Sequence, residues 1–172
     1  MMPLAPAGAS VPVPPAHHGH CLARAAVRDE MTLPSQPSAL PAARARAQRI
    51  LSEWGFGPQL SEDVAVCLSE LVTNAVQASA VLRPVAPVHV GLARERRWLL
   101  LAFADASPRF PLRLSAAGGD AVGGRGLAMV DALSTRWGWH AVSWPGLVKV
   151  VWAEWSRSSG RTPMRSLSAG SA

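Results

Sequence analysis

The chain has no tyrosine, only two cysteines and few charged residues. Charged side chains make up 16% of its 172 residues and apolar ones 49%, which is typical of soluble globular proteins. No apolar run approaches the ~20 residues of a membrane helix. Cys21 and Cys67 are too few for a disulfide or metal framework and suit a reducing compartment. We therefore expect a cytoplasmic protein without a membrane segment, and a chain of this length predicts one domain.

Much of the positive charge lies outside the centre of the chain. Residues 156–172 contain three arginines and no acid, which is half of the formal charge of +6. Between Met31 and Trp155, 12 basic residues accompany 9 acidic ones, a net of +3. Such a domain is not basic, so we expect no direct nucleic-acid binding, with a weak contact by the basic tail as the alternative.

The composition of the two ends predicts tails around one domain. Residues 1–30 are rich in proline and alanine, and they lack the basic start and apolar segment of a signal peptide. Residues 156–172 are rich in serine and glycine. We expect both segments to be disordered and residues 31–155 to form the folded domain.

The spacing of apolar residues predicts three helices. The first follows a short extended piece, with Ser38 as its N-cap and Gly55 at its end. The second is expected to begin at its cap, Ser61. After a loop rich in glycine and proline, helical spacing resumes over residues 125–138.

Two pairs of β-rich runs complete the order of elements. Residues 87–93 and 97–105 are joined by a charged turn, and residues 139–144 and 147–155 by Pro-Gly, so each pair is predicted to be a hairpin. The run over 97–105 is nearly all apolar and should be a central strand, buried on both faces. This order predicts an α+β fold: a two-layer α/β sandwich with one mixed or antiparallel sheet and helices on one face.

The second helix contains two poor helix formers, Thr73 and Asn74, at its middle. Each costs roughly 0.5 to 0.7 kcal/mol relative to alanine. The polar face of this helix carries acids but no lysine or arginine, and Glu70 lies one turn before Asn74. A carboxylate beside an amide oxygen suits Mg²⁺ or proton transfer. The alternative interpretation is a solvated helix face.

Asp105 ends the apolar run in "FADASP". An acid at the end of a buried strand can accept hydrogen bonds from a ligand at the mouth of the sheet. The alternative is structural, because Asp-Ala-Ser-Pro also forms a good turn.

The third candidate is "GGRGLAMV", in which Gly124, Arg125 and Gly126 precede or begin a helix. Glycines allow close approach to phosphate, a helix start offers unpaired N–H groups, and arginine adds a charged fork. A Rossmann motif is excluded because a loop, not a strand, comes before it, and a Walker A motif because no Gly-Lys-Ser/Thr follows. A flexible loop with a helix cap remains the alternative.

In sequence order, "SELVTNAV", "FADASP" and "GGRGLAMV" resemble the N, G1 and G2 boxes of the GHKL ATPases, which share the Bergerat fold. Within that superfamily the chain looks like the small bacterial branch, the anti-sigma-factor serine/threonine kinase-like ATP-binding proteins. The resemblance covers residues 31–155.

The resemblance implies roles for individual residues. Asn74 would hold Mg²⁺ at the ATP phosphates, and Glu70 would be the general base for a target hydroxyl or water. Asp105 would accept a hydrogen bond from the adenine amino group. The residues that would contact the nucleotide besides Asn74 are Asp105, Ser107, Gly124, Arg125, Gly126 and Leu127. One departure from larger relatives is that Asp105-Ala-Ser-Pro lacks glycine where those relatives have Asp-x-Gly-x-Gly, which makes this loop stiffer.

Two functions are compatible with this resemblance. The first is a serine/threonine kinase that phosphorylates a small antagonist protein in a partner-switching circuit with a sigma factor. The second is a nucleotide-responsive anti-sigma-like binding module without turnover. Either form could act as a homodimer. A sensor histidine kinase is disfavoured, because the candidate phosphoacceptors His17, His18 and His20 lie in the proline-rich tail.

Overall fold

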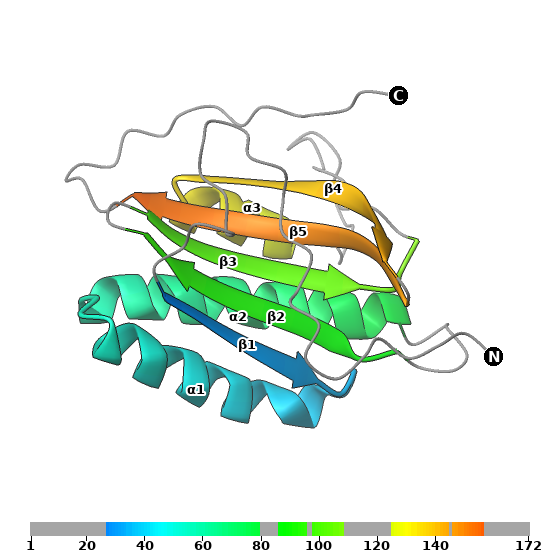
Figure 1. Ribbon diagram of the computed structural model, residues 1–172, viewed down its shortest axis with the longest axis horizontal. Coiled ribbons are helices and arrows are strands. Elements are labelled where there is room, and N and C mark those ends of the chain that lie inside the picture. The colour runs from blue at the N-terminus through cyan, green and yellow to red at the C-terminus, as the bar shows by residue number, and fades with distance from the viewer. Residues whose placement is uncertain (1–26, 80–85, 96–97, 109–124, 145, 157–172) are drawn as a thin grey trace.

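The computed structural model describes residues 27–79, 86–95, 98–108, 125–144 and 146–156. Within these residues the chain forms one five-stranded sheet with the order β1-β2-β3-β5-β4, and every pair of neighbours is antiparallel (Figure 1). The strands are β1 (Val27–Leu33), β2 (Val88–Arg94), β3 (Trp98–Asp105), β4 (Arg136–Trp144) and β5 (Leu147–Ser156).

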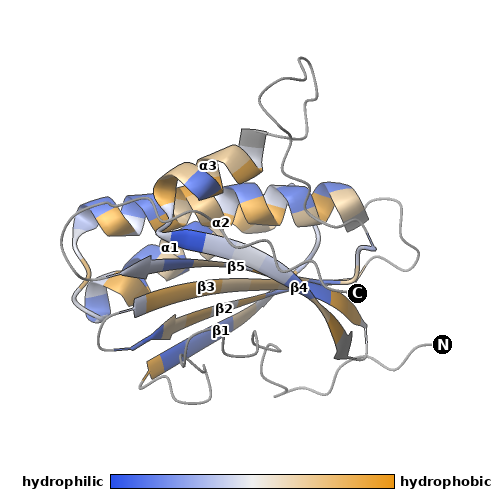
Figure 2. Ribbon diagram, turned by 90° about the horizontal axis from the view of Figure 1, so that it is seen from above, coloured by the Kyte–Doolittle hydropathy of each residue, from blue (hydrophilic) through white to orange (hydrophobic). Residues whose placement is uncertain are grey.

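Three α-helices lie on the same face of this sheet (Figure 2). They are α1 (Leu40–Glu53), which follows a 3-10 turn over Pro37–Ala39, α2 (Pro58–Ser79) and α3 (Arg125–Leu133). The predicted two-layer α+β sandwich is confirmed, and among the described strands the sheet is antiparallel rather than mixed. None of the described helices is long and apolar enough to cross a membrane.

The central position of β3 is also confirmed. Leu99, Leu101 and Phe103 are almost fully buried and belong to the main core under the helices. Ala102 and Ala104 point to the opposite face and are equally buried. Because burying a large apolar side chain stabilises the fold by roughly 1.5 to 3 kcal/mol, Leu99, Leu101 and Phe103 anchor β3 in the core.

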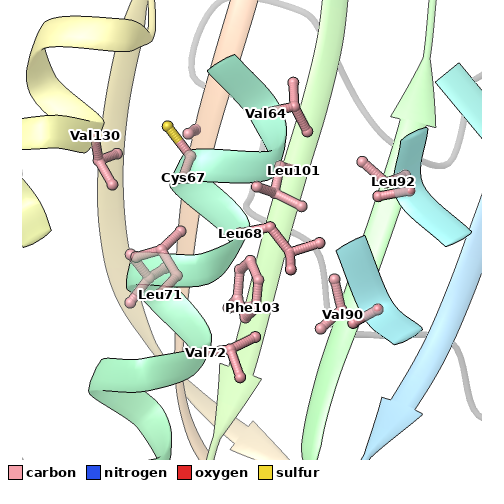
Figure 3. Close-up of a cluster of buried hydrophobic side chains, with 14 of the residues drawn as sticks. Val64, Cys67, Leu68, Leu71, Val72, Val90, Leu92, Leu101, Phe103 and Val130 are labelled. Atoms are coloured by element: carbon pink, nitrogen blue, oxygen red, sulfur yellow. The ribbon is translucent and has the colours of Figure 1, made fainter. Parts of the chain in front are cut away.

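Two sides of α2 contact the rest of the core (Figure 3). One side directs Leu68 and Val72 toward Leu101 and Phe103 of the sheet. The adjacent side directs Cys67 and Leu71 toward Val130 of α3. α2 therefore packs against the sheet with one side and against α3 with the adjacent side, and residues spaced by three or four along it face α3.

The predicted end of the first helix is confirmed. Gly55 has a φ of 75°, a conformation that costs glycine little. The N–H of Phe56 donates to the carbonyl of Leu51 and the N–H of Gly55 to that of Ser52, both at 2.9 Å. This pattern is a Schellman motif, which pairs the last free carbonyls of α1.

Both predicted N-caps are wrong. Ser38 lies inside the 3-10 turn, and the residue at the N-cap of α1 is Ala39, without a side-chain hydrogen bond. α2 begins at Pro58, and the Ser61 hydroxyl inside it donates to the carbonyl of Gly57 at 3.1 Å. Proline is well suited to a first helical turn because its missing N–H would be unpaired there anyway, so the helix starts before the serine.

The third helix is shorter than predicted, since α3 ends at Leu133 and β4 begins at Arg136. Arg136 lies opposite Glu154 of β5, and its Nε donates to the Glu154 carboxylate at 2.5 Å. This pairing across strands, which local spacing does not encode, takes residues 136–138 into the sheet.

The predicted boundaries of the domain were too narrow, because residues 27–30 form the start of β1 and Ser156 ends β5. The rest of both predicted tails falls outside the described ranges, so its disorder stays a prediction.

Candidate functional site

Glu70 and Asn74 lie on the side of α2 that faces α3. Asn74 follows Cys67 by seven residues and Leu71 by three, so it continues the stripe that contacts Val130. Both polar residues are partly exposed, whereas Cys67 is fully buried. Burial, reinforced by the nearby acids Asp63 and Glu70, raises the pKa of the Cys67 thiol to about 12. The thiol stays protonated at neutral pH and is not a nucleophile.

Gly126, in the first turn of α3, lies directly against this pair. A Cβ added at Gly126 would be 2.6 Å from Oε2 of Glu70 and 3.2 Å from Nδ2 of Asn74. Only glycine allows α3 to approach α2 this closely without moving either side chain. Two of the three motifs predicted to form the site therefore meet at the start of α3.

The chemistry available at this contact is that of a carboxylate, an amide and a helix start. The first turn of a helix has unpaired N–H groups and a positive dipole end, which favour anions such as phosphate. A half-turn of the Asn74 amide about Cβ–Cγ exchanges its nitrogen and oxygen, so the same position can present an oxygen to a cation. Among the described residues no group of three or more His, Cys, Asp and Glu could hold a metal ion. A single protein oxygen nevertheless fits Mg²⁺ that is bound mainly through phosphate and water.

Asp105 lies at the end of β3 in a different environment. It is 3% exposed, and its Oδ1 accepts the backbone N–H of Ser107 at 2.7 Å. This hydrogen bond closes the turn that was the structural alternative for Asp-Ala-Ser-Pro. The same oxygen accepts a hydrogen bond from Nζ of Lys149 at 2.6 Å.

Lys149 is the functional candidate that the sequence analysis did not identify. It lies opposite Asp105 in the β3–β5 register and is 4% exposed. Its Nζ also donates to the carbonyl of Ser107 at 2.9 Å. A lysine between apolar residues in "LVKVVW" is a visible anomaly, but its partner follows only from β5 lying next to β3.

Of the remaining predicted site residues, the structure describes some fully and others not at all or only in their backbone. Ser107 is fully buried, and its backbone N–H and carbonyl bind Asp105 and Lys149. The Leu127 side chain belongs to the main core. Arg125 begins α3, but its side chain lies outside what the structure describes, as does all of Gly124. The phosphate-side assignments of Gly124 and Arg125 therefore stay predictions.

The fold agrees with a comparison against protein families. Residues 33–152 match the histidine kinase-like ATPase domain. This match covers most of the chain, and the chain therefore belongs to the histidine kinase-like ATPase family, which is part of the GHKL superfamily. Membership of this family indicates that the chain contains an ATP-binding domain. A comparison with curated proteins found no match.

Proposed function

We propose that this protein is an ATP-dependent serine/threonine kinase of the anti-sigma-factor type. Its substrates would be ATP and a hydroxyl of a small antagonist protein, and its second partner a sigma factor. The observation that carries the proposal is the contact of Glu70 and Asn74 with Gly126 at the start of α3. This contact puts a partly exposed carboxylate at the helix end where phosphate would bind.

The transfer step follows from these positions. The hydroxyl oxygen of the target forms a bond to the γ-phosphorus while the bond from that phosphorus to the β,γ-bridging oxygen breaks, and ADP leaves. Glu70 receives the proton of the hydroxyl. Asn74 would hold Mg²⁺, which neutralises the phosphate charge. Asp105 would fix the base, and the N–H groups of α3 would orient the phosphates.

A second candidate is a binding module that responds to nucleotide but transfers no phosphate. The loop after Asp105 favours it, because Ser107 and Lys149 hold the carboxylate through Oδ1 and leave this loop little freedom. Partner exchange would then depend on nucleotide binding alone. Oligomeric state does not distinguish the two candidates, and a homodimer is compatible with both.

The two candidates differ in one assay. The partner would be identified by mass spectrometry of the co-purified complex, and phosphate transfer to it would be followed with labelled ATP. Glu70→Gln keeps the shape of the side chain but removes the proton acceptor, so we expect transfer to fall ~10²- to 10⁴-fold with ATP binding retained. Asn74→Ala should instead weaken Mg²⁺-dependent ATP binding.

The matched control is Glu62→Gln, which removes a charge from the same helix at an exposed position where the carboxylate accepts a hydrogen bond from Gln48. It should transfer phosphate at the wild-type rate. If the wild type binds ATP and partner but transfers nothing, the kinase proposal is wrong and the binding module remains. If Glu70→Gln transfers at the wild-type rate, Glu70 is not the base.

A further inference from the structure

The chain contains a single lysine. Of its 17 Lys and Arg residues, 16 are arginine, and the remaining one is Lys149. That lysine is also the basic residue that the structure buries against Asp105, with both side chains only 5% exposed. A lysine ends in a compact ammonium with three donors, whereas arginine presents a broad planar fork. The difference matters where a donor must fit between a carboxylate, a carbonyl and a ligand.

The hydrogen bonds of Lys149 Nζ show which of its N–H donors remain for a ligand. Two of its three N–H donors point to Oδ1 of Asp105 and to the carbonyl of Ser107, at 2.6 and 2.9 Å. Oδ1 accepts a second hydrogen bond, from the N–H of Ser107. The contacts within the described residues thus use Oδ1 and two donors. The third donor of Nζ and Oδ2 of Asp105 are the groups that can face a ligand.

We propose that Lys149 is a second base-reading residue of the nucleotide site. This inference rests on the proposed binding of ATP with its adenine at Asp105. Oδ2 accepts an N–H of the 6-amino group, and Nζ donates its third N–H to the ring nitrogen beside that group. A 6-aminopurine has such an acceptor on each side of its amino group, N1 on one and N7 on the other.

The same geometry disfavours guanine. Its ring N–H and 2-amino group together match both oxygens of a carboxylate, but Oδ1 is already occupied by Ser107 and Lys149. The 6-oxo group of guanine would also place an oxygen acceptor opposite Oδ2, which is an acceptor itself. Because the pair is buried, a base that leaves either group unpaired loses affinity rather than exchanging the contact for water.

The test compares ATP with 1-deaza-ATP and 7-deaza-ATP, in which a C–H replaces one ring nitrogen. Calorimetry on the full chain with Mg²⁺ should show that one of the two analogues binds the wild type ~10- to 100-fold more weakly than ATP, the range expected for a hydrogen bond from a charged group. In Lys149→Met that analogue and ATP should bind equally. A structural ion pair alone would instead weaken all three ligands by the same factor.

A second measurement needs no variant and covers the case in which Lys149→Met does not fold. Protein labelled with ¹³C and ¹⁵N only in lysine gives the side-chain signals of one residue. Saturating ATP should shift these signals, and the analogue that lacks the contacted nitrogen should leave them near their free positions.

Equal affinity of the wild type for ATP and both analogues, or lysine signals that ATP does not move, would overturn the role of Lys149. The proposed ATP site would survive that result. If the wild type binds no ATP, the proposed function fails, and the role of Lys149 falls with it.

Discussion

Glu70 and Asp105 are the two acids of the candidate site, and their surroundings differ. Glu70 is partly exposed, with Gly126 and Asn74 beside it. Asp105 is buried and paired with Lys149. A carboxylate that must accept a proton needs access and no fixed cation, whereas one that must hold a base needs a fixed orientation. In the proposed kinase, this difference would assign proton transfer to the half of the site around Glu70 and base recognition to the half around Asp105.

The largest effect on stability is expected at the buried pair. Removing one partner leaves the other charge buried without compensation, which typically costs about 3 to 5 kcal/mol. We therefore expect Asp105→Asn and Lys149→Met each to lower the free energy of unfolding by about that amount. The double variant should lose less than the sum of the two. Urea denaturation of the four proteins measures the coupling, and additive losses would contradict a direct interaction.

A smaller effect, on transfer rather than on stability, is expected at Gly126. In Gly126→Ala the new methyl group would meet Oε2 of Glu70 at 2.6 Å. The carboxylate is the end of a flexible side chain and can turn away, so the fold should survive. Misplacing a catalytic group by about 1 Å can cost ~10²-fold in rate, and we expect a loss of that order in phosphate transfer.

Gly57→Ala is the matched control, because a Cβ at Gly57 meets nothing within 4 Å. It should leave both transfer and melting temperature close to wild type. Wild-type transfer by Gly126→Ala would show that the contact between α2 and α3 does not position Glu70.

The positions of Glu70, Asn74 and Gly126 in the candidate site could be predicted from local patterns. Helical spacing put Glu70 and Asn74 on one face, and the resemblance to the N and G2 boxes brought the start of α3 to them. The buried strand β3 and the end of α1 at Gly55 were predictable for the same reason, since apolar spacing and a single glycine determine them locally.

The other half depends on pairing between distant strands. Lys149 meets Asp105 because β5 lies between β3 and β4, an order that spacing within either hairpin does not determine. The two N-cap predictions were wrong for another reason. Ser38 and Ser61 fit the preference for serine at N-caps, but each helix starts where the preceding proline and the packing of the chain allow it.

The smallest effect is expected on the pH dependence of stability, at His89, which lies outside both halves of the candidate site. Burial lowers its pKa from the ordinary value of 6.5, with Glu30 opposing, and its Nδ1 is 3.2 Å from Oγ1 of Thr32. A lowered pKa means that the fold prefers the neutral ring, so stability is complete above the ordinary pKa and is lost as the pH falls through the folded value. We expect this contribution to be less than about 1 kcal/mol, because the ring is partly exposed to solvent.

Thermal unfolding between pH 5 and 7 measures this contribution. His89→Gln should flatten the profile without changing ATP affinity. A change in ATP affinity would show that the sheet face bearing His89 communicates with the site.

The most direct test of the proposed site is whether its two halves, around Asn74 and around Asp105, bind the same ATP molecule. Calorimetric titration with ATP and Mg²⁺ would be carried out on the wild type, Asn74→Ala and Asp105→Asn. Each substitution removes one hydrogen-bond acceptor or ligand oxygen, and we expect each to cost about 1 to 3 kcal/mol of binding free energy. We expect one ATP to bind per chain, and both variants to bind it more weakly than the wild type. Unchanged affinity in Asp105→Asn would contradict the assignment of the adenine to β3.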